Sequence, residues 1–331
     1  MLDYFCNFFK GKKPRGDVSQ KISASRRKLL ARELSSYDAV VITGGSSGIG
    51  RGFIEVLDDI CHVRLCNISR NVPSGLENRS DFLHISCDLA NSAALDSAFR
   101  EVCSFIYLDK NKEKCSKNPK ILLINNSGFG AYGEFPAPDI DRNCQMIDLN
   151  VRALTRLCGL FHPLIASGGG AIINIASTAA FQACPQLSVY AATKSYVLSF
   201  TMAIGYELNR SGCKCLCVCP GPTSSNFFAA AGFNSPPLPG GFGHKPCDVA
   251  IGAYTALAKG KNLKVIGLLN SAQTALVRLL PMNFVGFRFK AHKKNLRTVF
   301  FLSARFALQS IDKKFYNYGL IIKRLCRFLK K

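Results

Sequence analysis

The chain has 331 residues, of which 48% are hydrophobic, with 24 phenylalanines and no tryptophan. That is enough for one large domain with appendages or for two small domains, and it predicts a substantial core. The formal net charge is +22, but residues 1–36 carry +6 and residues 284–331 carry +12, which leaves +4 for residues 37–283. We expect a nearly balanced domain with two basic ends. No recognition motif accompanies this charge, so we do not expect nucleic-acid binding.

Fifteen cysteines occur without the pattern of a secretory leader. The first residues, MLDYFCNFFKGKK, have an acid at position 3, a short apolar run and no small-residue cleavage site. We expect reduced thiols and a cytoplasmic location.

Residues 10–28 are basic and polar, which predicts a loose or weakly helical segment. Beyond them, apolar runs typical of buried strands alternate with helical patterns. The expected strands are 38–43, 62–68, 82–89, 121–128, 171–177, 213–219 and 263–269, and the expected helices are 51–60, 91–107, 139–166, 188–210 and 247–261. Such continuous apolar strands indicate an α/β fold, a doubly wound parallel sheet covered by helices on both faces in three layers. A charged surface loop is expected at 110–120, and a Pro/Gly-rich loop at 220–246 is predicted to be a functional lid or disordered.

The strand at 213–219, CKCLCVC, has four cysteines at alternate positions, which suggests a metal site. In a strand they would spread over ~20 Å along one face. The sulfurs around a tetrahedral zinc must lie within roughly 4 Å of one another. Since the chain has no Cys-x-x-Cys pair, we expect core packing and no metal.

The stretch TGGSSGIG (43–50) lies between an expected strand and an expected helix. Glycines there let the backbone turn tightly and approach a pyrophosphate, which the amino end of the helix can bind. A plain strand–helix turn would also account for it. The predicted contacts are Gly44, Ser46, Ser47, Gly48, Ile49 and Gly50.

The second strand ends at NISRN, where NAD-dependent enzymes of this fold usually have an acid. This chain has Arg70 instead, and a guanidinium suits a 2′-phosphate. NADP(H) is therefore favoured over NAD(H). The alternative is that Arg70 is only a solvated charge at the end of a strand.

Tyr190 and Lys194, in YAATK, are four residues apart and so lie one helical turn apart. A nearby ammonium favours the phenolate and would make tyrosine a better acid–base group. Ser177 precedes Tyr190 by thirteen residues, and Asn150 precedes Ser177 by twenty-seven.

These motifs resemble the short-chain dehydrogenase/reductase family in its single-domain Rossmann form. The resemblance covers roughly residues 37–270 and rests on TGGSSGIG, CDL with Asp88, NNSG (125–128), DLNV with Asn150, Ser177, YAATK and PGPTSS (220–225), in family order and spacing. It implies an NAD(P)-dependent oxidoreductase that interconverts a carbonyl and an alcohol.

The resemblance also implies roles for single residues. Tyr190 would be the acid–base, Lys194 would lower its pKa and bind the nicotinamide ribose, Ser177 would hydrogen-bond the substrate oxygen, and Asn150 would hold a water that links Lys194 to solvent. Asp88 and Leu89 would lie by the adenine, Asn126 by the adenosine ribose, and Gly221, Thr223 and Ser225 by the carboxamide and phosphates. Members of the family are commonly dimers or tetramers, so a homo-oligomer is expected.

The apolar loop 226–245 suits a hydrophobic ketoacyl, steroid-like or lipid-like ketone. A different hypothesis is a cofactor-binding scaffold, associated with a membrane or a partner, that has little turnover. The predicted division is a basic extension at 1–36, a catalytic domain at 37–270 and a basic amphipathic helical tail at 271–331. The tail suits the surface of an anionic membrane, with peripheral attachment, and equally suits packing on its own core or on a second subunit.

Overall fold

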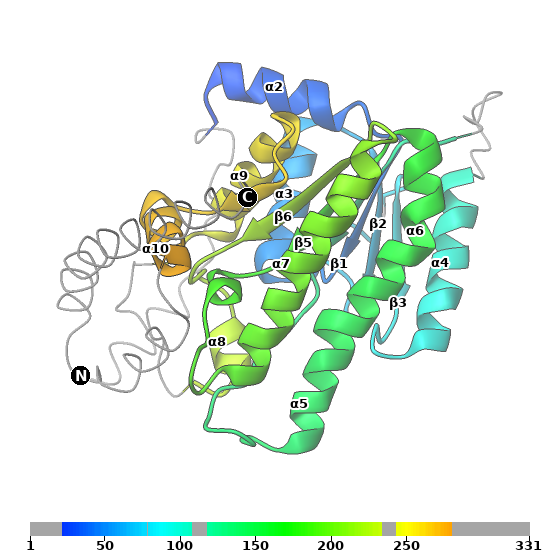
Figure 1. Cartoon of the computed structure of the whole chain (residues 1–331). Helices are drawn as coiled ribbons and strands as arrows, with labels where there is room; N and C mark the ends of the chain where they lie inside the picture. Colours follow the sequence, from blue (N-terminus) through cyan, green and yellow to red (C-terminus); the bar gives the residue numbers. More distant parts are fainter. Residues whose placement is uncertain (1–21, 78, 108–117, 234–242, 280–331) are drawn as a thin grey trace, which may run out of the picture.

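In the part of the chain that the structure describes, seven strands form one parallel sheet in the order β3-β2-β1-β4-β5-β6-β7 (Figure 1). This computed structural model describes residues 22–77, 79–107, 118–233 and 243–279. The strands are β1 (Ala39–Thr43), β2 (Arg64–Ser69), β3 (Phe82–Ser86), β4 (Ile121–Asn125), β5 (Ala171–Ile175), β6 (Lys214–Cys219) and β7 (Leu263–Val265). Every residue of β1, β4 and β5 is buried, because helices cover both faces. The predicted doubly wound α/β fold is confirmed.

The helices form two layers, one on each face of the sheet (Figure 1). One layer consists of α2 (Ala24–Leu34), α3 (Gly48–Ile60) and α9 (Pro246–Ala258), and the other of α4 (Ser92–Tyr107), α6 (Leu154–Gly168) and α7 (Ser188–Asn209). Side chains alternate between the two cores along each strand: Val40 and Ile42 join one core, whereas Ala39 and Val41 join the other.

The winding of the sheet changes direction beside its first strand. β1 pairs with β2 on one side and with β4 on the other, so successive strands are added outward in both directions. In open parallel sheets, ligands bind in the crevice at the carboxyl ends of the strands where this reversal occurs. The fold alone therefore places the binding crevice beside the carboxyl ends of β1 and β4.

Helix α2 is part of the packed core, although the sequence assigns it to a basic extension. Leu30 and Leu34 are fully buried against the sheet-covering helices. Near the end of α2, Glu33 accepts a hydrogen bond from Lys214 Nζ of β6 at 2.7 Å. The packed unit thus begins before the predicted boundary at residue 37, and from Ala24 onward the segment is a regular helix rather than a loose one.

The chain after α9 departs from the predicted strand at 263–269. β7 contains only three residues, and α10 (Leu268–Leu279) begins after Gly267, whose φ of +90° favours glycine. The aperiodic loop predicted for 220–246 contains the short helix α8 (Phe227–Ala230) and a parallel bridge between Thr223 and His244. Residues 1–21 of the predicted N-terminal extension, 110–117 of the charged loop, 234–242 of the Pro/Gly-rich loop and 280–331 of the tail lie outside the described residues.

The cysteine-rich stretch forms the buried strand β6, as predicted. Cys215, Cys217 and Cys219 lie on one face and are at most 3% exposed. Burial holds the pKa of the Cys215 thiol well above its usual range, so this side chain stays a neutral apolar group. Among the described residues, no group of three or more metal-binding side chains occurs, and no helix is long and apolar enough to cross a bilayer.

Because α2 is packed against the core, we expect substitutions of its buried residues to lower the stability of the protein. Leu34→Ala should lower the free energy of unfolding by about 2–5 kcal/mol, because it removes a fully buried side chain. Arg32→Ala, at an exposed position of the same helix, is the control and should change it by less than about 0.5 kcal/mol. Urea unfolding of the full chain measures both. Equal midpoints for Leu34→Ala and the wild type would show that α2 does not pack as described.

Candidate active site

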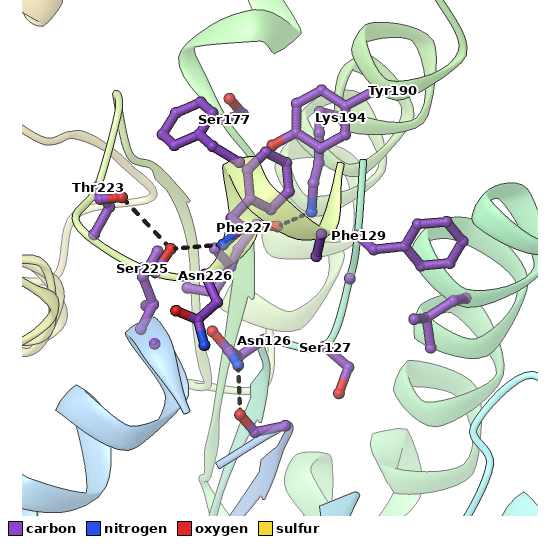
Figure 2. Close-up of a pocket in the computed structure, with 18 of the residues that line it drawn as sticks. Asn126, Ser127, Phe129, Ser177, Tyr190, Lys194, Thr223, Ser225, Asn226 and Phe227 are labelled. Carbon is purple, nitrogen blue, oxygen red and sulfur yellow. Dashed lines mark hydrogen bonds between the residues drawn. The ribbon is translucent and has the colours of Figure 1, made fainter. Parts of the chain in front are cut away.

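A cleft of about 830 Å³ opens at the carboxyl ends of the strands. Figure 2 shows it between the loop that follows β6, the loop that follows β4 and the amino-terminal half of α7. The predicted site residues that line it are Gly44, Ser46, Ser47, Gly48, Ile49, Arg70, Asp88, Leu89, Asn126, Ser177, Tyr190, Lys194, Gly221, Thr223 and Ser225. Gly50 and Asn150 lie behind its wall. The structure thus brings together residues from seven separate segments of the chain.

The glycines after β1 are required by the path of the backbone. Gly44 has a φ of +69° and Gly48 a φ of +56°, in the left-handed region that glycine tolerates. A Cβ on Gly50 would lie 2.2 Å from the carbonyl oxygen of Gly44 and 2.5 Å from Nδ2 of Asn126. The first turn of α3 therefore approaches the end of β1 so closely that only glycine fits, which leaves a cradle able to hold a diphosphate.

Asn126, directly after β4, and Thr43, the last residue of β1, hold this cradle together. Asn126 Nδ2 donates to the carbonyl oxygens of Thr43 at 3.0 Å and of Gly44 at 3.2 Å. Thr43 Oγ1 in turn accepts the backbone N–H groups of Asn126 and Ser127, both at 3.0 Å. Thr43 is not among the predicted site residues, although the sequence places it at the end of a buried strand.

Tyr190 and Lys194 lie one turn apart on α7 and both face the cleft (Figure 2). Lys194 is 5% exposed, and its Nζ donates to the carbonyl oxygen of Ile175 at 2.9 Å. The same Nζ lies 5.9 Å from the centroid of the Tyr190 ring. The ammonium is thus held between the end of β5 and the phenol.

Burial disfavours the charged form of both groups, so it shifts their pKa values in opposite directions. It raises the pKa of the Tyr190 phenol to about 12, and a hydrogen bond with Ser177 opposes this shift. It lowers the pKa of the Lys194 ammonium to about 8, and the thiols of Cys217 and Cys219 oppose that shift. The sequence predicts a lowered pKa for Tyr190, but the protein by itself raises this pKa. Desolvation disfavours the phenolate more strongly than the surrounding groups favour it.

Ser177 and Asn150 are fixed by the local backbone. Ser177 follows β5 and begins a 3₁₀ helix, where its Oγ accepts the N–H of Ala179 at 3.1 Å. Asn150 lies in a π-helical segment, Asp148–Ala153, that interrupts the single helix predicted for 139–166. Such segments are frequent at functional sites because they turn a side chain out of the regular helical pattern.

The Asn150 amide reaches the loop after β4. Its Oδ1 accepts the N–H of Phe129 at 3.1 Å, and its Nδ2 donates to the Phe129 carbonyl at 2.9 Å and to Thr193 Oγ1 at 3.1 Å. A Cβ on Gly128 would lie 2.8 Å from Asn150 Oδ1 and 3.3 Å from Lys194 Nζ. Asn150 therefore positions the loop that passes Lys194, and the water-binding role implied by the resemblance stays a prediction.

Aromatic side chains cover the catalytic end of the cleft. The ring centroid of Phe227, in α8, lies 5.3 Å from that of Tyr190 (Figure 2). Phe228 packs edge-on against Phe227. Tyr132 and Phe233 stack with their centroids 4.1 Å apart. The sequence indicated an apolar loop here but did not identify these rings, since their partners come from distant segments.

The loop after β6 is held by contacts that were not predicted from the sequence. The backbone N–H of Ser224 donates to the carbonyl of His244 at 2.9 Å, and the N–H of His244 donates to the carbonyl of Pro222 at 3.0 Å. Asn270 of α10 approaches the same loop so closely that a Cβ on Gly221 would lie 2.3 Å from its Nδ2. No sequence spacing connects these positions, because they meet only in the folded chain.

A glycine cradle at the reversal point of a parallel sheet, beside a buried tyrosine and lysine, defines a nucleotide-dependent oxidoreductase of the Rossmann type. The family model for short chain dehydrogenases matches residues 38–233. The chain belongs to the short-chain dehydrogenase family.

Two relatives of known name match parts of the chain. Probable oxidoreductase EphD of Mycobacterium tuberculosis is 32% identical over 120 residues, which is 35% of this chain and 20% of EphD. A 3beta-hydroxysteroid dehydrogenase of Mediterraneibacter gnavus is 26% identical over 196 residues, 56% of this chain and 66% of that protein. The chain therefore spans less than two thirds of the length of both relatives. A short-chain dehydrogenase from Sphingobium yanoikuyae, solved in complex with NADPH, has a TM-score of 0.59 and 26% identity over 73% of this chain and 96% of that one.

The close approach at the cradle makes a prediction for two helical glycines. Gly50→Ala should weaken dinucleotide binding by more than tenfold and lower the melting temperature, because the new methyl group would collide with the carbonyl oxygen of Gly44. Gly159→Ala, on α6 where a Cβ meets nothing within 4 Å, is the matched control and should stabilise the protein by up to about 1 kcal/mol. Calorimetric titration and thermal melts measure both effects. Normal binding by Gly50→Ala would contradict the assigned cradle.

Proposed function

We propose that the protein is an NADP(H)-dependent oxidoreductase that interconverts a hydrophobic ketone and its alcohol. The observation that carries the proposal is the convergence of Ser177, Tyr190 and Lys194 on one cleft that continues into the glycine cradle. When bound, the nicotinamide dinucleotide supplies or accepts the hydride. Gly44, Gly48 and Asn126 would hold its phosphates and ribose, as described above for the cradle.

The protein supplies the proton. With its pKa raised to about 12, Tyr190 is a neutral phenol at pH 7 and can donate its proton to the substrate oxygen as that oxygen gains negative charge. Ser177 Oγ would hydrogen-bond the same oxygen and orient it. Lys194, still mostly charged at pH 7, would stabilise the negative charge left on Tyr190. This arrangement favours reduction, because the reverse direction must begin from a phenolate.

The aromatic cover supports a hydrophobic substrate. Phe227, Phe228, Phe233 and Tyr132 all line the cleft beside Tyr190. Apolar rings exclude water from the reacting carbonyl and bind apolar surface. The name of the Mediterraneibacter relative, a 3beta-hydroxysteroid dehydrogenase, agrees with a steroid-like or other ring-containing ketone.

Arg70 supports NADP(H) over NAD(H). It lies on the cleft wall directly after β2, and within the described part of the chain its guanidinium forms no ion pair. Homo-oligomer formation stays a prediction. Attachment of the basic tail to an anionic membrane also stays a prediction, since residues 280–331 are outside the described part of the chain.

The enzyme hypothesis requires Tyr190 for turnover and not for cofactor binding. Tyr190→Phe should reduce kcat for ketone reduction by at least about 100-fold, because it removes the proton donor and keeps the ring. The Kd for NADPH, from nicotinamide fluorescence, should change less than about threefold. Wild-type protein that binds NADPH and turns over no member of a ketone panel would favour the scaffold hypothesis instead.

The lowered pKa of Lys194 predicts how cofactor affinity depends on pH. Lys194 is charged below about pH 8 and becomes neutral above it, so NADPH should bind more weakly as pH rises through this value. Fluorescence titrations from pH 6 to 10 should show this decline in the wild type and equally in Tyr190→Phe, which retains the lysine. A decline that disappears in Tyr190→Phe would assign the titration to the tyrosine and contradict the prediction.

A further inference from the structure

A buried amide joins the two loops that would hold the adenosine half of the cofactor. Asn67 of β2 is fully buried, and most of the other buried residues of this strand are apolar. Its Oδ1 accepts the backbone N–H of Gly45, in the glycine cradle, at 2.8 Å. Its Nδ2 donates to Ser69 Oγ at 2.8 Å and lies 3.0 Å from His84 Nδ1 of β3. Both ends of the amide are therefore bonded.

The contacts of Asn67 require a glycine at position 45 and a neutral imidazole at His84. A Cβ on Gly45 would lie 2.6 Å from Asn67 Oδ1, so the loop and the amide fit together only with glycine at this position. Because an amide nitrogen can only donate, His84 Nδ1 must accept, which requires a neutral ring. Burial lowers the pKa of the His84 imidazole and so favours the neutral form.

On its other side the network reaches Arg70. Ser69 Oγ, which accepts from Asn67, donates to the carbonyl oxygen of Asn71 at 2.8 Å. A separate hydrogen bond, outside this network, runs from Ser86 Oγ of β3 to the carbonyl oxygen of Arg70 at 3.3 Å. The backbone that carries Arg70 is therefore tied to the same amide that holds Gly45 of the cradle.

We propose that Asn67, acting through Ser69, is a positioning residue that sets the preference for NADP(H), because it fixes the place of Arg70 relative to the diphosphate cradle. The inference rests on the proposed function. A 2′-phosphate and the diphosphate belong to one rigid ligand, so a guanidinium can bind the 2′-phosphate well only at a fixed distance from the cradle. Asn67 itself is too deeply buried to touch the cofactor.

The experiment measures Kd for NADPH and for NADH by fluorescence and takes the ratio of the two constants. Arg70→Ala should reduce the preference for NADPH by about tenfold or more. Ser69→Ala and Asn67→Leu should each reduce it by about three- to tenfold while Arg70 is intact. In the double variant, Ser69→Ala should add nothing to the effect of Arg70→Ala, since both act on one contact.

Asn143→Leu is the matched control, because Asn143 is likewise a buried asparagine that bonds to the backbone, but outside the cofactor region. Its Nδ2 donates to the carbonyls of Pro136 and Asp139. It should lower stability without changing the ratio. If Asn67→Leu does not fold, Ser69→Ala and the double variant decide the matter alone.

An unchanged ratio in folded Asn67→Leu and Ser69→Ala, or independent effects of Ser69→Ala and Arg70→Ala, would overturn the proposal. So would equal affinity of the wild type for NADPH and NADH, although turnover that depends on Tyr190 would leave the oxidoreductase function standing. Failure of the wild type to bind either dinucleotide would refute the proposed function itself.

Discussion

The close contact between the end of β1 and the first turn of α3 determines where the site can be. Gly50 lies so close to the carbonyl oxygen of Gly44 that a Cβ at this position would collide with it. Asn126, directly after β4, donates to the same carbonyl oxygen. This contact fixes the angle at which α3 leaves the sheet, and it leaves the amino end of that helix open toward the cleft. The loops after β2, β4 and β6 line the same cleft beside this cradle.

At the catalytic end of the cleft, burial disfavours the charged forms of both Tyr190 and Lys194. Burial of Lys194 disfavours its ammonium and lowers its pKa, although Nζ donates a hydrogen bond to the backbone carbonyl of Ile175. The same burial keeps Tyr190 protonated. An exposed tyrosine–lysine pair would retain ordinary pKa values and would lack the low-dielectric surroundings in which a positioned proton donor is most effective.

The sequence predicted those parts of the structure that depend on local pattern. Continuous apolar runs identified the sheet, and the glycine cradle and the tyrosine–lysine pair were found because their spacing is local along the chain. The sequence did not reveal contacts between distant segments. Phe227 against Tyr190, His244 against the loop after β6, and Asn67 against Gly45 each join residues whose proximity no periodicity encodes. The short β7 was overestimated because the apolar residues that begin α10 continue the pattern of the strand.

Polar groups inside the sheet connect its architecture to the position of α7. At the ends of β4 and β5, Asn125 Nδ2 donates to Asn174 Oδ1 at 2.8 Å, and Asn174 Nδ2 donates to Thr201 Oγ1 of α7 at 3.0 Å. All three side chains are at most 3% exposed, so each bond forms without competition from water. An apolar core would let α7 slide or rotate slightly on the sheet at little cost, whereas breaking these bonds would leave buried amides without partners. Since Tyr190 and Lys194 lie on α7, the buried asparagines hold the acid–base pair at a defined distance from the cradle on the other side of the sheet's centre.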